Sequence, residues 1–90
     1  MALRMNPEEA QTLALKALGF VAGSEGALER LMELSGLDLS TLRARAGEPE
    51  TLAALLDFLL SDEGLLVDFC HGEAIDAKAV HMARYVLGGP

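Results

Sequence analysis

Residues 49–70 read PETLAALLDFLLSDEGLLVDFC, and this stretch decides the fold. Between Leu52 and Leu60 every residue is apolar except Asp57. At about 100° per residue, the apolar side chains cover more than half of a helix circumference, so such a helix must have neighbours on several sides. The remaining narrow stripe, polar except for an alanine, consists of Glu50, Ala54, Asp57 and Ser61. We therefore predict an all-α fold, a compact single domain packed around a central apolar helix at about residues 49–61.

The central stretch contains a break, because Asp62 can cap a new helix that begins at Glu63. Other breaks follow from glycines and capping residues, and the segments between them carry apolar residues at three- and four-residue spacing. The predicted fold has roughly five to six short helices. Their expected ranges are about 7–21, 25–35, 39–46, 49–61, 63–71 and 77–87. We expect a single helical domain over residues 1–88 and a disordered tail at residues 89–90.

Three further expectations concern the first two helices. Gly19 lies inside the first helix at some cost in propensity, and close packing against another helix would explain it. Leu34 shares the apolar face of the second helix with Leu31 and is expected to point inward. Arg30 is expected to reach Glu33 in part.

The charge of the chain argues against two classes of partner. Fourteen acidic residues outweigh seven basic ones, which gives a formal charge of −7. Phosphate backbones and anionic membranes would repel such a domain, so we predict no nucleic-acid and no membrane partner. The N-terminal residues MALRMNPEEA lack the apolar run of a signal peptide, and no stretch is long and apolar enough to span a bilayer. We expect a cytoplasmic protein.

The segment Asp68–Asp76 has the most reactive composition, since it also contains Cys70, His71 and Glu73. Adjacent residues on a helix point about 100° apart, so Cys70 and His71 are poorly placed to bind one metal. Cys70 is the only cysteine, which leaves no disulfide and no cysteine-rich zinc site. His81 is expected on a polar helix face, away from Cys70. We predict no catalytic, cofactor-binding or metal residue, and keep an enzyme or metal protein using this segment as the alternative.

A second alternative is a helix-turn-helix, with Gly36 at the turn between the second and third helices. The recognition helix would offer only Arg43 and Arg45 to a phosphate backbone. These arginines are more simply explained as partners of neighbouring acidic residues. Nucleic-acid binding is therefore the less favoured alternative.

Three phrases together indicate a family: ALKALGFVA at residues 14–22, SGLDLSTLRARAGEPE at 35–50 and LAALLDFLLSDEGLLVDFC at 52–70. The chain resembles an uncharacterised, mostly alphaproteobacterial family of small proteins, domain of unknown function 3572. The resemblance covers nearly the whole chain and implies an all-helical cytoplasmic protein of bacterial origin. It implies no activity, ligand or catalytic residue.

The sequence favours a non-enzymatic interaction module that binds another protein or forms a homo-oligomer. Leu15 and Val67 lie off the inward faces of their helices and are candidates for an exposed apolar patch. An acidic face is expected on the second helix at Glu25, Glu29 and Glu33. Asp57 is the other residue of interest, because a carboxylate on so apolar a helix must reach solvent or find a partner.

Overall fold

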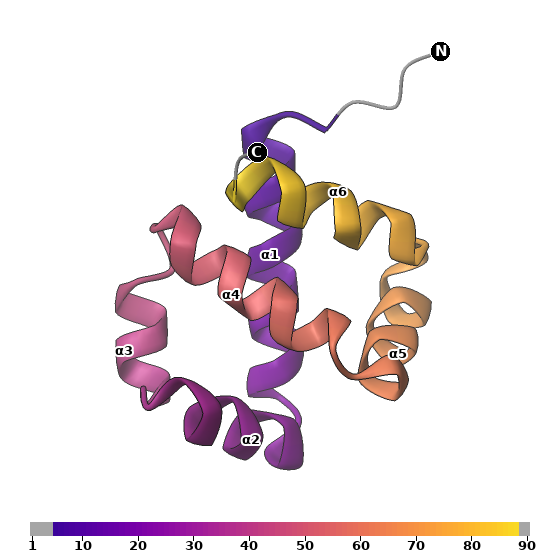
Figure 1. Cartoon of the computed structure of the whole chain (residues 1–90). Coiled ribbons are helices and arrows are strands. Elements are labelled where there is room, and N and C mark those ends of the chain that lie inside the picture. Colours follow the sequence, from indigo (N-terminus) through magenta and orange to yellow (C-terminus); the bar gives the residue numbers. More distant parts are fainter. Residues whose placement is uncertain (1–4, 89–90) are drawn as a thin grey trace.

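The structure is a computed structural model that describes residues 5–88, except for the side chain of Glu25. It contains six α-helices and no strand in this range, which confirms the all-α fold (Figure 1). The predicted tail at residues 89–90 lies outside the described residues. The helices are α1 (Pro7–Ala22), α2 (Glu25–Ser35), α3 (Leu39–Ala44), α4 (Pro49–Leu60), α5 (Glu63–Glu73) and α6 (Ala77–Gly88).

Local capping chemistry sets most of the helix ends. Asn6 and Glu9 form a capping box at α1, in which Asn6 Oδ1 accepts from the Glu9 N–H at 2.8 Å and Glu9 Oε1 accepts from the Asn6 N–H at 3.0 Å. Asp62 caps α5 by accepting from the Leu65 N–H at 3.1 Å. The break between α4 and α5 is thus confirmed. The third helix is shorter than predicted, because the chain leaves helical geometry at Arg45.

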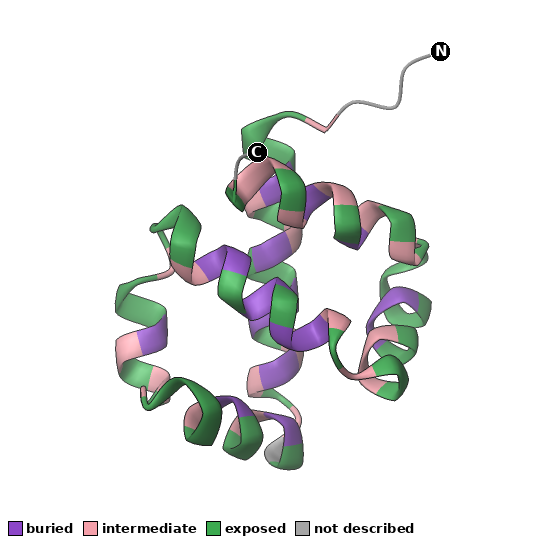
Figure 2. Cartoon of the chain, viewed as in Figure 1, coloured by how far each residue is buried: buried purple, intermediate pink, exposed green. Residues whose placement is uncertain are grey.

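The core is centred on three helices, since α4 packs against both α1 and α6, and these two also pack against each other. Leu52, Leu56 and Leu59 of α4 are at most 1% exposed. Facing them, α1 buries the small side chains Ala10, Ala14 and Ala17, whose size allows close helix packing. Figure 2 shows the buried faces of α1 and α4 meeting at the centre. The central role predicted for α4 is therefore shared with α1 and α6.

The segment formed by α2 and α3 extends from this core. α2 packs on α1, and α3 then returns the chain to the start of α4 (Figure 1). The turn between them depends on Gly36, whose φ of 72° lies in the left-handed region that glycine adopts without steric cost. Leu42 is the buried residue of α3.

Three predictions about α1 and α2 are wrong. A Cβ built on Gly19 meets nothing within 4 Å, so no close helix packing explains this glycine. Leu34 is 75% exposed, because it lies in the last turn of α2. Arg30 pairs across the fold with Asp62, the cap of α5, at 2.7 Å, and not with Glu33 of its own helix.

Candidate functional site

The predicted interaction residues lie on three different helices. Leu15 of α1 is 42% exposed and Val67 of α5 is 58% exposed. Glu29 and Glu33 are exposed on α2, whereas the side chain of Glu25 lies outside the described residues. Leu15 lines a groove that contains neither Val67 nor the α2 glutamates. Of the predicted interaction residues, this groove therefore includes Leu15 alone.

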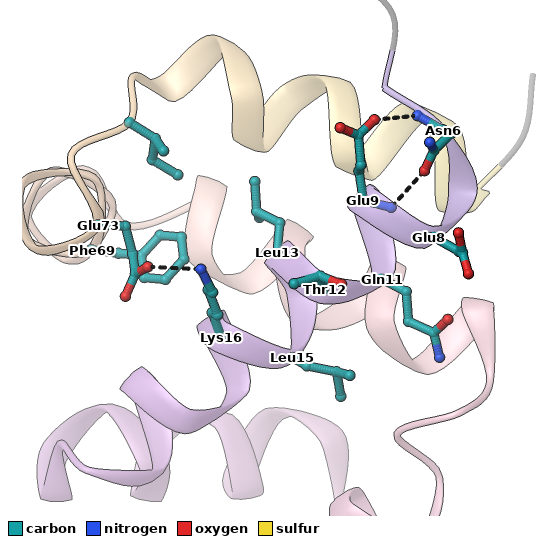
Figure 3. Close-up of a pocket in the computed structure, with 11 residues that line it drawn as sticks. Asn6, Glu8, Glu9, Gln11, Thr12, Leu13, Leu15, Lys16, Phe69 and Glu73 are labelled. Carbon is teal, nitrogen blue, oxygen red and sulfur yellow. Dashed lines mark hydrogen bonds and ion pairs between the residues drawn. The ribbon is translucent and has the colours of Figure 1, made fainter.

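The groove beside Leu15, here called the α1 groove, has a volume of about 660 Å³ and is lined by α1 together with Phe69, Glu73 and Ile75. Figure 3 shows Lys16 of α1 reaching toward Glu73 of α5, with an Nζ to Oε1 distance of 3.6 Å. At its other end Asn6 and Glu9 hydrogen bond to each other. Four of the polar lining residues of the α1 groove are thus paired with one another, whereas Glu8, Gln11 and Thr12 also line it.

A second groove, here called the α4 groove, lies between α2, α3 and α4 and has a volume of about 650 Å³. Its base is apolar, since the lining residues Leu31, Leu42, Leu55 and Phe58 are all buried. Leu34 also lines it and is the most exposed of the large apolar side chains in the described part of the chain. Leu34 thus extends the apolar base of the groove to the surface, with polar side chains on α4 beside it, and apolar surface rimmed by polar residues marks a candidate binding surface.

The polar stripe of α4 forms one wall of the α4 groove, because Glu50, Ala54, Asp57 and Ser61 all line it. Asp57 is half-exposed, and its Oδ1 accepts a hydrogen bond from Arg84 Nε at 2.7 Å. The hydrogen bond and the charge of Asp57 raise the pKa of Arg84 above its ordinary value. The expectation for Asp57 is confirmed in both forms, since the carboxylate reaches solvent and also has a partner.

Arg30 of α2 contacts Phe58 at the base of the α4 groove and Asp62, the cap of α5. Its guanidinium lies 5.5 Å from the centroid of the Phe58 ring, and its Nη1 is 2.7 Å from Asp62 Oδ2. The Leu65 backbone N–H, and then Arg30, hold the pKa of Asp62 below its ordinary value. One side chain of α2 thus contacts both α4 and the cap of α5.

The segment Asp68–Asp76 shows no assembled chemical site. Cys70 is buried, and burial, followed by the charge of Asp76, raises the pKa of its thiol, so the nucleophilic thiolate is disfavoured. His71 and His81 are both exposed. Across residues 5–88 no group of three or more His, Cys, Asp or Glu side chains is placed to hold a metal ion.

The structure also does not support the helix-turn-helix alternative. The candidate recognition helix, α3, has six residues, which is fewer than two turns. Arg45 follows α3 and lines the α4 groove. No ion pair joins Arg43 or Arg45 to an acidic residue within the described range, so their expected pairing with neighbouring acids is not observed.

Sequence reasoning missed Leu34 as a surface residue. Helical spacing places it at the edge of the apolar face of α2, next to Ala27 and Leu31. The sequence did place Leu34 in the last turn of α2, directly before Ser35 and the helix-ending Gly36, and this position could have indicated that it is exposed. The two residues that flank Leu34, Glu33 and Ser35, are exposed as well.

Comparisons with known proteins give one match. The model of a family described as "Protein of unknown function (DUF3572)" matches residues 7–90. Neither the curated proteins nor the solved structures include a match. Within residues 5–88, no helix has both the length and the apolar character needed to cross a membrane.

Proposed function

Because the chain belongs to the DUF3572 family, whose description assigns no activity, we propose a function from its surface. In this proposal the protein is a non-enzymatic interaction module of the cytoplasm, and its α4 groove binds an apolar segment of another protein. The free, buried thiol of Cys70 is compatible with a reducing compartment.

The single observation that carries this proposal is Leu34, 75% exposed beside the apolar base of the α4 groove. When a partner covers a leucine exposed to this degree, the burial stabilises the complex, on the order of 1.5–3 kcal/mol for full burial. Glu29 and Glu33, predicted as interaction residues, lie on the same helix but do not line this groove.

Site-specific photo-crosslinking in the producing cells tests the proposal. A benzophenone amino acid replaces Leu34 in one variant and Val67 in a second, matched variant, because both residues are exposed and apolar and only Leu34 lines the groove. We expect a defined adduct with one other protein, identified by mass spectrometry, at Leu34 and not at Val67. The adduct should disappear when Ala54→Arg fills the middle of the groove.

Equal adducts at the two positions, or no adduct at Leu34, would contradict the proposal. An adduct at Leu34 between two copies of the chain would show a homo-oligomer in place of binding to another protein. Light scattering on the purified protein distinguishes these cases independently, since the proposal expects a monomer.

A further inference from the structure

We propose, building on the function above, that the occupant of the α4 groove is an amphipathic helix of another protein with an apolar face and a basic flank. The two walls of the groove differ in character. Glu48, Glu50 and Asp57 line the α4 side, whereas Leu34 and Leu37 line the opposite side. A partner that matches both walls has leucine-like side chains on one face and lysine or arginine along one edge.

The carboxylates of the α4 wall retain capacity for such a partner. Glu48 Oε1 accepts from Thr51 Oγ1 at 3.2 Å, and Asp57 Oδ1 accepts from Arg84 Nε. No ion pair joins Glu50 to another described residue. Since an ionised carboxylate offers about four acceptor positions, each of the three can accept further hydrogen bonds from a cationic side chain. Among the described residues, Arg45 is the only basic residue that lines the α4 groove.

The length of the α4 wall fits a helix. From Glu50 to Ser61 the exposed stripe of α4 extends about 16 Å, at about 1.5 Å per residue, or roughly three helical turns. Ala54 lies in the middle of this stripe, and its small side chain leaves room for a helix to approach. Basic residues at i, i+3 or i+4 and i+7 of the partner would fall on one edge, along the row of carboxylates.

A second copy of this chain is the less favoured occupant. Each copy carries a formal charge of −7, so association of two copies starts with repulsion. A partner with a basic flank is instead attracted to the groove. The attraction should decrease as ionic strength rises, because salt screens exposed charges.

Two designed peptides test the inference on the full chain. Each is an amidated helix of about 15 residues with leucines at i, i+3, i+4 and i+7, and the flanking positions are lysine in one peptide and glutamate in the other. We expect fluorescence anisotropy to show binding of the lysine peptide and at least about tenfold weaker binding of the glutamate peptide.

Three variants locate the effect. Glu50→Lys should weaken binding of the lysine peptide several-fold and strengthen binding of the glutamate peptide. Glu29→Lys makes the same charge change on α2 outside the α4 groove and should leave the ratio between the two peptides unchanged. Leu34→Ala should weaken the binding of both peptides. Circular dichroism checks that each variant keeps its helix content.

The outcomes separate this inference from the proposed function. Equal binding of both peptides, lost in Leu34→Ala, would overturn the basic flank and leave the groove as an apolar binding site. If Leu34→Ala leaves binding of the lysine peptide unchanged, that binding comes from charge attraction alone, and the inference is overturned. If neither peptide binds, the inference is also overturned, while crosslinking at Leu34 still decides the proposed function.

Discussion

At the scale of single residues, two helices end in the same left-handed conformation but with different residues. α2 ends at Gly36 with φ of 72°, and α5 ends at Ala74 with φ of 57°. A left-handed conformation costs a residue with a Cβ about 1–2 kcal/mol, whereas glycine adopts it freely. Ala74 nevertheless donates its N–H to the end of α5, at the carbonyls of Cys70 and His71. The rest of the fold therefore maintains a strained residue at this turn.

Exchanging the two residues should have opposite effects on stability. Gly36→Ala should lower the free energy of unfolding by about 1 kcal/mol. Ala74→Gly should raise it by about 0.5–1 kcal/mol, since relief of strain outweighs the added freedom of the unfolded chain. Urea denaturation followed by circular dichroism measures both changes. A loss of stability in Ala74→Gly would contradict the assigned strain.

At the scale of helices, charged side chains join elements that are distant in sequence. Arg30 connects α2 to Phe58 of α4 and to the cap of α5, and Arg84 connects α6 to Asp57 of α4. Exposed pairs of this kind contribute little to stability on average, so the packing of the apolar core holds the helices together.

Asp62, which accepts from the Leu65 N–H of its own helix and pairs with Arg30 of α2, predicts a specific pH dependence of stability. Asp62 has a lowered pKa in the folded chain, so its ionised form stabilises the fold above the ordinary aspartate pKa, and this contribution is lost as the pH falls through the lowered value. Asp62→Asn keeps a capping side chain and removes the charge. The variant should therefore be less stable than the original at neutral pH, and the difference should shrink as the pH falls below about 4.

Denaturation at a series of pH values measures this difference. In the background of Arg30→Met the effect of Asp62→Asn should be smaller, because one of the groups that lowers the pKa is removed. If the stability difference between the original chain and the Asp62→Asn variant does not change with pH, the assignment is wrong.

At the scale of the whole molecule, the same residue type has two different roles. Leu56 is fully buried at the centre of the three-helix core, whereas Leu34 lies 75% exposed beside the α4 groove. Leu34 lies in the last turn of α2, where Glu33, Leu34 and Ser35 are all exposed.

Two matched substitutions distinguish these roles. Leu56→Ala should lower the free energy of unfolding by about 2–5 kcal/mol, because it removes buried methyl groups and leaves a cavity. Leu34→Ala should change it by less than about 0.5 kcal/mol while it weakens partner binding. Urea denaturation measures the first quantity and the peptide assay measures the second. A large loss of stability in Leu34→Ala would show that Leu34 belongs to the core.

The amino-acid sequence by itself determined the helices of this protein, because capping residues, glycines and apolar spacing act within a few residues of each other. Asn6, Asp62 and the apolar face of Leu52–Leu60 are examples in which local chemistry is sufficient. Only the tertiary structure decided which apolar residues have a neighbour, since coverage depends on where another helix ends. For this reason Leu34 became a surface residue and Gly19 faces open space. Packing likewise turned the polar stripe around Asp57 from a solvent face into the wall of a groove.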